Sequence, residues 1–238
     1  MRRITLVALA GLALGAAPRS GFETMTPELQ AMQRDDLANP GMLYVAEGEA
    51  VWGQEGCGSC HSVTAMRGVA TRYPTLDAAS RAPIDLTGRI AQCREMRQSK
   101  PPQPREGGPM LALTAFVAHQ SRGLPLQPDP RLQDARRQGE ALFRERRGQL
   151  NLSCAQCHDD NPGRKLAGST IPEGHANGYP LYRLEWQGLG SLQRRLRNCI
   201  AGVRSEPYPP GAPEYIAFEA YLAGRARGLV VETPAVRP

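Results

Sequence analysis

The chain has few aromatic side chains, almost no lysine and a single long apolar run. Phenylalanine, tryptophan and tyrosine make up 5% of its 238 residues, whereas glycine and proline number 25 and 21. This composition indicates short helices connected by long loops. Because Lys100 and Lys165 are the only lysines, arginine supplies nearly all the positive charge. Arginine favours planar, paired contacts to oxyanions.

The one long apolar run lies near the N-terminus, directly after two arginines. It extends from Ile4 to Ala17, and its length of about 14 residues is short of the roughly 20 that a membrane-spanning helix needs. A basic start, an apolar stretch and small residues before Pro18 are typical of a secretory signal peptide. We therefore expect residues 1–17 to be a signal peptide, export to the periplasm, and no membrane span in the mature chain.

The motif C-x-x-C-H occurs twice, at residues 57–61 and 154–158. In this motif the two thiols bond to the vinyl groups of haem, and the histidine binds the iron. The sequence therefore predicts a c-type cytochrome with two covalently bound haem c groups, haem 1 and haem 2. The expected haem-binding residues are Cys57, Cys60, His61, Cys154, Cys157 and His158.

The formal net charge of +6 does not indicate a nucleic-acid-binding protein. Removing Arg2 and Arg3 with the signal peptide leaves +4, and four ionised haem propionates add about −4. The mature haem protein is therefore expected to be close to neutral overall, with no nucleic-acid partner.

The two motifs belong to a longer internal repeat. Gly48–Trp52 and Gly139–Phe143 precede them with the pattern of a helix end that places an aromatic ring near haem. Each motif is followed by a long irregular stretch, an R-x-x-x-C segment and a helical pattern that begins at a proline, as first-turn prolines do. A helix, a haem-wrapping loop and a packing helix follow one another in cytochrome c domains. We therefore predict a mainly α fold with two tandem cytochrome c-like domains, extensive loops and an N-terminal extension.

The predicted boundary between the domains is the proline-rich segment 124–130. Thr26, Pro27 and Glu28 are expected to start a helix in the N-terminal extension. The resulting division is residues 18–44 for the extension, 45–124 for the first domain with haem 1, and 131–238 for the second domain with haem 2 and the active site.

The second axial ligand of each iron is chosen from a short set of residues. No methionine lies beyond Met110, so haem 2 has no methionine from its own half. For haem 2 the local choices are Cys199, His175, Lys165 or an open site, and for haem 1 they are Cys93, Met96, Met110 or His119. Cys93 and Cys199 occupy equivalent places in the repeat, which indicates equivalent roles. Either both bind iron as thiolates, or they form a disulfide with each other, as exported cysteines often do.

The R-x-x-x-C segments carry a resemblance to a known family. Arg89 to Cys93 and Arg195 to Cys199, followed by Val203 to Tyr208 and Pro213 to Tyr215, resemble the dihaem A subunits of the Sox thiosulfate-oxidising cytochromes. The resemblance covers nearly the whole mature chain. It implies that His61 and Cys93 bind the iron of haem 1, that His158 and Cys199 bind that of haem 2, and that Cys199 is the catalytic sulfur, found as a persulfide in that family. It also implies that Arg195 binds substrate.

The resemblance further implies an activity and its partners. The family's reaction joins thiosulfate to a cysteine of a SoxYZ-like sulfur-carrier protein, as an L-cysteine S-thiosulfotransferase. A SoxX-like monohaem cytochrome c completes a heterodimer, and another cytochrome c accepts the electrons. An arginine beside a thiolate suits a dianionic substrate, because paired charged hydrogen bonds hold its oxygens. Arg194, Arg197 and Arg204 either extend this positive field or form an ordinary solvated face. The alternative function is a general dihaem electron carrier or a peroxidase-like cytochrome.

Overall fold

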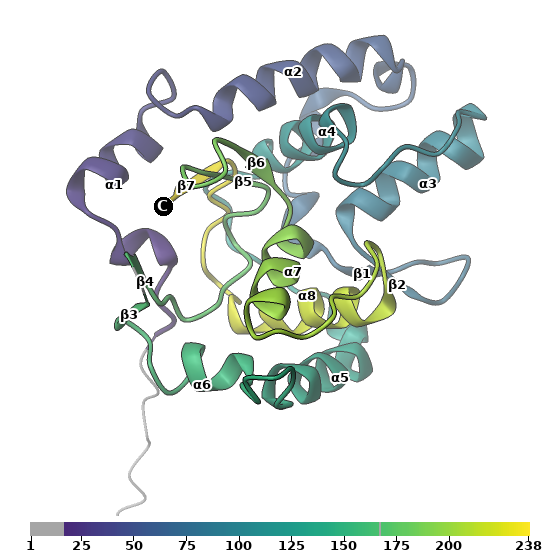
Figure 1. Cartoon of the computed structure of the whole chain (residues 1–238). Coiled ribbons are helices and arrows are strands. Elements are labelled where there is room, and N and C mark those ends of the chain that lie inside the picture. The colour runs from purple at the N-terminus through teal and green to yellow at the C-terminus, as the bar shows by residue number, and fades with distance from the viewer. Residues whose placement is uncertain (1–16, 167) are drawn as a thin grey trace, which may run out of the picture.

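The computed structural model describes residues 17–166 and 168–238. The expected signal peptide, residues 1–17, lies outside these ranges except for its last residue. Within the two ranges no helix is both long and apolar enough to cross a membrane. The fold is mainly helical, with short strands and long loops, as the sequence predicts (Figure 1).

The helices and strands of the described residues follow one another along two successive halves. The α-helices are α1 (Pro27–Arg34), α2 (Gly41–Gln54), α3 (Leu86–Gln98), α4 (Gly108–His119), α5 (Gln133–Arg144), α6 (Cys154–His158), α7 (Leu192–Gly202) and α8 (Pro213–Arg225). The strands are β1 (Thr75–Leu76), β2 (Pro83–Ile84), β3 (Lys165–Leu166), β4 (Ser169–Thr170), β5 (Leu181–Arg183), β6 (Gly188–Gly190) and β7 (Ala235–Arg237). They pair as β1–β2, β3–β4 and β6–β5–β7.

The core of the first half is the crossing of α2 and α4, at the top of Figure 1. At the crossing, a Cβ atom on Gly48 would lie 2.1 Å from the carbonyl oxygen of Ala112. Only glycine allows the two backbones to approach this closely. Near the end of α2, the Trp52 ring packs 5.7 Å from the ring of Phe116. Both aromatic rings are buried in the core.

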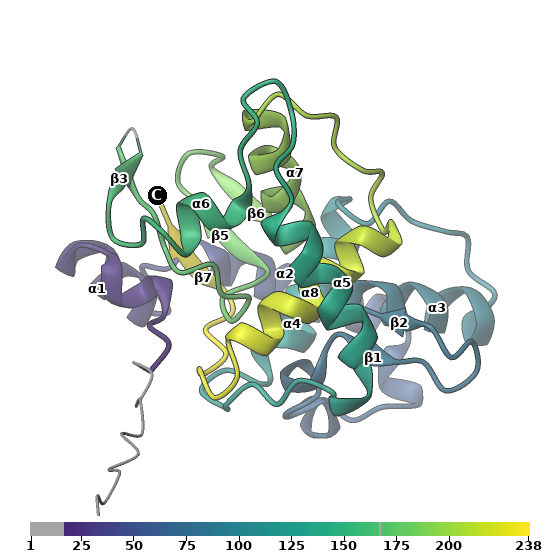
Figure 2. The ribbon, with the colours of Figure 1, turned by 90° about the horizontal axis from the view of Figure 1, so that it is seen from below.

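The second half repeats this crossing with α5 and α8 (Figure 2). A Cβ atom on Gly139 would lie 2.0 Å from the carbonyl oxygen of Ala217, and the Phe143 ring packs 5.2 Å from the ring of Tyr221. The predicted helix ends before both motifs and the predicted helices after them are confirmed, with α4 and α8 beginning at or beside their prolines.

The segments between the motifs and the spare cysteines correspond residue by residue, 70–94 with 176–200. The strand registers agree, because Thr75 pairs with Ile84 in the first half and Leu181 with Gly190 in the second. The next residue caps a helix in each half: Asp85 accepts from the Gly88 amide at the start of α3, and its counterpart Ser191 does the same at α7. The repeat seen in the sequence is therefore a repeat in structure.

The termini are joined to each other. Thr26 caps α1 by accepting from the Leu29 amide, which confirms the predicted helix start. The side chain of Gln33 in α1 accepts from the Val236 amide at 3.0 Å, and Asn39 donates to the carbonyl of Pro234 at 2.9 Å. The N-terminal extension is therefore fixed against β7.

The proline-rich segment expected at the domain boundary packs against the C-terminal region. The Leu126 amide donates to the carbonyl of Leu229, and the Val231 amide donates to that of Leu124, both at 2.9 Å. Leu126 and Val231 are also members of one buried apolar cluster. The segment between the halves is therefore held by backbone hydrogen bonds and by burial.

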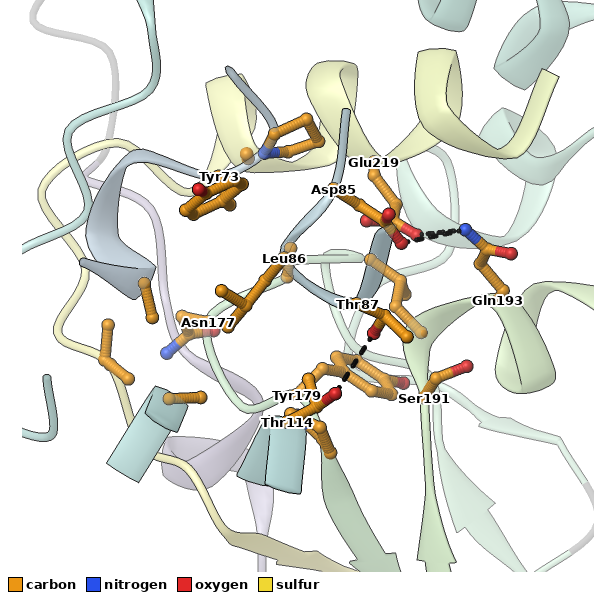
Figure 3. Close-up of a pocket in the computed structure, with 18 of the residues that line it drawn as sticks. Tyr73, Asp85, Leu86, Thr87, Thr114, Asn177, Tyr179, Ser191, Gln193 and Glu219 are labelled. Carbon is orange, nitrogen blue, oxygen red and sulfur yellow. Dashed lines mark hydrogen bonds between the residues drawn. The ribbon is translucent and has the colours of Figure 1, made fainter. Parts of the chain in front are cut away.

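A cavity of about 100 Å³ lies between the two halves (Figure 3). Its lining includes the corresponding tyrosines Tyr73 and Tyr179. On one side, the Gln193 side-chain amide donates to Oε1 of Glu219 at 2.8 Å and to Oδ2 of Asp85 at 3.2 Å. Two carboxyl groups thus share one amide donor in the interior.

The shared amide predicts a pH-dependent stability. Burial, followed by the negative charge of Asp85, raises the pKa of Glu219 well above its ordinary range. The folded protein then binds a proton that the unfolded chain releases near pH 4.3, so the free energy of unfolding falls as pH rises above that value. We expect Glu219→Gln to reduce this fall, measured as Tm between about pH 5 and pH 8. The exposed Glu206→Gln is the control. A Glu219→Gln profile parallel to that of the unmodified protein contradicts the prediction.

Candidate haem and sulfur site

The first motif forms a short 3₁₀ turn, Cys57–Ser59, directly after α2. The His61 amide closes the turn by donating to the carbonyl of Cys57 at 3.1 Å. The His61 ring lies 6.4 Å from the ring of Trp52, as expected for an aromatic next to haem, and it is exposed. Across residues 17–166 and 168–238, neither ring nitrogen of His61 has a hydrogen-bond partner.

The second motif is the helix α6, begun by a capping box of Ser153 and Gln156. The His158 ring lies 6.2 Å from the ring of Phe143, the counterpart of Trp52. Its Nδ1 donates to the carbonyl of Pro172 at 2.7 Å, so Nε2 is left to bind iron. Burial, ahead of every other effect, lowers the pKa of His158, which favours the neutral imidazole that a metal requires.

Each spare cysteine is coupled to the motif of its own half. Cys93 lies in α3 and Cys199 in α7. Burial, followed by the charge of Cys93, raises the pKa of the Cys57 thiol. Burial, followed by the charge of Cys199, raises the pKa of the Cys154 thiol to about 11. All six cysteines are free, so the structure favours two separate cysteine sites over a bond between Cys93 and Cys199.

The other candidate ligands are engaged elsewhere or exposed. His175 contacts the Glu173 carboxylate through Nε2 at 3.1 Å, and His119 contacts the carbonyl of Thr233 through Nδ1 at 3.1 Å. Met110 is buried in the core of α4, whereas Met96 is 68% exposed. Lys165 is exposed on β3. These placements leave Cys93 and Cys199 as the strongest candidates.

Arg195 lies beside the second motif, as the R-x-x-x-C spacing predicts. Burial is the largest effect on two neighbouring groups, lowering the pKa of His158 and raising that of Tyr179, and the nearby charge of Arg195 acts to lower both. The Tyr179 hydroxyl is also within the field of Cys199. Arg195, Tyr179 and Cys199 therefore lie close together, beside the second motif.

The three neighbouring arginines differ in their surroundings. Arg194 lies over the Trp186 ring at 4.4 Å and donates to the carbonyl of Leu189 at 3.2 Å. Arg204 is exposed and has a positive φ of 59°. Arg197 keeps its Nε buried without a partner among the described residues. Of the three, Arg197 alone has an unused buried donor.

Unpaired buried donors in the second half fit a haem group. The Nε of Arg147 and of Arg197 and the hydroxyl of Tyr215 have no hydrogen-bond partner within the described residues. Arg147 and Arg197 both act on the pKa of Tyr215, which burial chiefly raises, so the three groups are close together. Buried donors without partners are costly, and haem propionates satisfy such donors. The residues present therefore suit haem c at Cys154, Cys157 and His158.

Tyr179 was not among the residues expected from the sequence. The dipeptides Tyr73-Pro74 and Tyr179-Pro180 stand at corresponding positions of the repeat. A comparison of the two halves that starts before the R-x-x-x-C segments would have found them. Tyr215 lies in the segment 213–215 that carries the family resemblance, whereas Arg147 has no sequence signal, because it approaches Arg197 and Tyr215 only in the folded chain.

Comparisons with known proteins agree with this geometry. The model of the SoxA/TsdA cytochrome c domain matches residues 47–126 and 138–231. The L-cysteine S-thiosulfotransferase subunit SoxA of Pseudaminobacter salicylatoxidans is 38% identical over 229 residues, which cover 92% of this chain and 80% of that protein. The subunit of the same name from Rhodovulum sulfidophilum is 36% identical with the same shares covered. The crystal structure of SoxXA from P. pantotrophus has a TM-score of 0.89 and 29% identity, covering 93% of this chain and 87% of that chain.

Proposed function

Because this chain belongs to the SoxA/TsdA cytochrome c family, we propose that it is the haem-bearing subunit of a thiosulfate-oxidising enzyme, an L-cysteine S-thiosulfotransferase. Its cofactors are two haem c groups, one in a domain at residues 45–124 and one in a domain at residues 131–238. A signal peptide at residues 1–17 directs it to the periplasm. There it forms a heterodimer with a monohaem cytochrome c of the SoxX type, as in the related SoxXA structure.

The reaction joins the outer sulfur of thiosulfate to a cysteine of a SoxYZ-like carrier protein. One S–S bond forms, the carrier thiol loses its proton, and two electrons leave for an acceptor cytochrome c. The bound haems supply one-electron redox chemistry and a path for these electrons. The remaining tasks belong to side chains: binding a dianion, presenting a sulfur nucleophile and positioning the carrier thiol.

In this proposal, Cys199 presents the nucleophilic sulfur and Arg195 binds the substrate. A thiolate is the reactive form of cysteine, and neighbouring cations favour it. Arg195 holds the sulfonate oxygens of thiosulfate by charge-assisted hydrogen bonds. His158 keeps its ring fixed by the bond to Pro172, so the geometry around Nε2 is set before substrate binds. Cys199 would hold the iron of haem 2 together with His158, as Cys93 would hold that of haem 1 together with His61.

The observation that carries the proposal is the placement of Arg195 and Cys199 on α7, close to the second motif and to Tyr179. A general electron carrier has no need of an arginine without an ion pair in the described part of the chain beside the cysteine that would hold its iron. The experiment is an assay of cytochrome c reduction with thiosulfate, the purified heterodimer, and carrier protein present or omitted. We expect reduction that requires both thiosulfate and the carrier.

Two further measurements separate the alternative. A peroxidase-like cytochrome needs an open or histidine-ligated second haem, so a high-spin or bis-histidine EPR signal from haem 2 contradicts the proposal. A low-spin, thiolate-type signal supports it. A mass spectrum of the mature protein measures the number of haems, the signal cleavage site and any added sulfur. We expect two haems and about 32 Da of added sulfur on Cys199.

A further inference from the structure

At one pair of corresponding positions, 77 and 183, the two halves carry side chains of opposite charge. In the first half, Arg89 contacts the Asp77 carboxylate at 2.7 Å. Burial opposes the charge of Arg89, but hydrogen bonds to Asp77 and Tyr73 raise the pKa of its guanidinium. The Asp77 side chain is 3% exposed, so the ion pair is shielded from water on that side. The cation beside Cys93 is therefore neutralised from within the chain.

In the second half, the counterpart of Arg89 is Arg195 and the counterpart of Asp77 is Arg183, the last residue of β5. An acid in one half is thus replaced by a base in the other. The two guanidinium groups are close enough that, after burial, the charge of Arg195 is the largest effect lowering the pKa of Arg183. Throughout the described residues, the Arg195 side chain has no ion pair and no hydrogen bond.

Arg183 is built into the fold with one donor unused. It is 8% exposed, and its Nε is buried without a partner among the described residues. Its guanidinium contacts the Glu185 carboxylate at 2.7 Å, and the Glu185 side chain is 62% exposed. The Trp186 ring lies 5.2 Å from the guanidinium carbon. An anion would satisfy this buried Nε, which lies close to Arg195, an arginine without an ion pair among the described residues.

We propose that Arg183 and Arg195 together form the binding site for the dianionic substrate, and that Arg183 restricts substrate binding to the second half. This inference rests on the proposed function, because it concerns the same site. The corresponding position in the first half carries Asp77, which occupies Arg89 and repels an anion. Two guanidinium groups hold three sulfonate oxygens through paired hydrogen bonds. Tyr179 lies close to both arginines, since the charge of each acts on its hydroxyl.

The test replaces Arg183 by aspartate, the residue of the first half, in the heterodimer with haem bound. We expect Arg183→Asp to raise both the Kd for thiosulfate, measured by calorimetry without carrier or acceptor, and the KM at least about 30-fold. We expect kcat at saturation to fall much less, because the nucleophile remains. Arg183→Lys keeps the charge without the planar fork and should raise both constants less. The control is Arg227→Asp, an exposed site with the same change in net charge.

Each outcome decides the inference. An unchanged Kd in Arg183→Asp overturns it. Loss of haem 2 or a shifted haem 2 potential, with Kd and KM altered no more than by Arg227→Asp, also overturns it, because Arg183 then holds a propionate. If the unmodified heterodimer binds thiosulfate through Arg183 but shows no carrier-dependent turnover, the anion site stands and the proposed function fails. If turnover is normal and Arg183→Asp matches the control in Kd and KM, the inference alone fails.

Discussion

Replacing Cys199 by alanine is expected to lower carrier-dependent thiosulfate oxidation at least about 10³-fold, since a lost nucleophile removes most of an enzyme's rate enhancement. Cys199 lies in α7, close to Cys154 and Tyr179. Outside the second motif, no other described cysteine could replace its sulfur there. Haem 2 should remain attached through Cys154, Cys157 and His158. The measurements are the thiosulfate-dependent rate, the haem content and the EPR signal of haem 2.

The matched comparison is Cys93→Ala in the first half. This change should alter the EPR signal of haem 1 and reduce turnover far less, because the neighbouring Arg89 is already paired with Asp77. Two results contradict the assignment. Full activity in Cys199→Ala excludes it as the catalytic sulfur, and equal losses in both variants indicate that axial ligation alone, rather than chemistry at one sulfur, sets the rate.

Much of the fold follows from local sequence signals. The helix ends at Trp52 and Phe143, the proline starts of α4 and α8, and the Thr26 cap are all confirmed. Each depends on residues within a few positions of one another, and local spacing determines them. The two haem motifs are also local patterns, because haem attachment requires neighbouring residues, and their haem-binding role stays a prediction.

The opposite charges of Asp77 and Arg183 were not predicted, although both residues can be read in the sequence. Asp77 directly follows β1 and Arg183 ends β5, and these strands are only two and three residues long. Such strands have too few residues for an alternating pattern to identify them. That Asp77 faces Arg89, and Arg183 faces Arg195, depends on the turn that brings β1 and β5 back toward α3 and α7, which is long-range information.

The junction between the halves was equally hidden from sequence reasoning. The segment 124–130 has the composition of a linker, yet its backbone donates to and accepts from residues 229–231. Asp85, Gln193 and Glu219 come from three separate helices or caps and meet at one cavity. Proline content predicts where a helix cannot continue, but it does not predict whether the chain then meets another part of the protein.

Substitution of the glycines at the two helix crossings should destabilise the fold strongly. An alanine Cβ at Gly139 lies 2.0 Å from the carbonyl oxygen of Ala217, and one at Gly48 lies 2.1 Å from that of Ala112. In both cases the atom met is backbone, so relief requires the helices to separate. We expect each Gly→Ala variant to lose about 3 kcal/mol of unfolding free energy, near the upper end for overpacking. Tm then falls by about 6–12 °C.

Gly53 provides the control, because it lies in α2 with Gly48 and a Cβ there meets nothing within 4 Å. Gly53→Ala should leave Tm unchanged or raise it slightly, since alanine restricts the unfolded chain and favours helix. Thermal unfolding of the haem-loaded protein, followed by far-UV circular dichroism, measures all three variants. Equal Tm values for Gly48→Ala and Gly53→Ala contradict the close crossing. In Gly139→Ala, separation of α5 from α8 should also move Phe143 away from His158. Reduced covalent incorporation of haem 2, with haem 1 retained, then indicates that the α5–α8 crossing forms the haem 2 pocket.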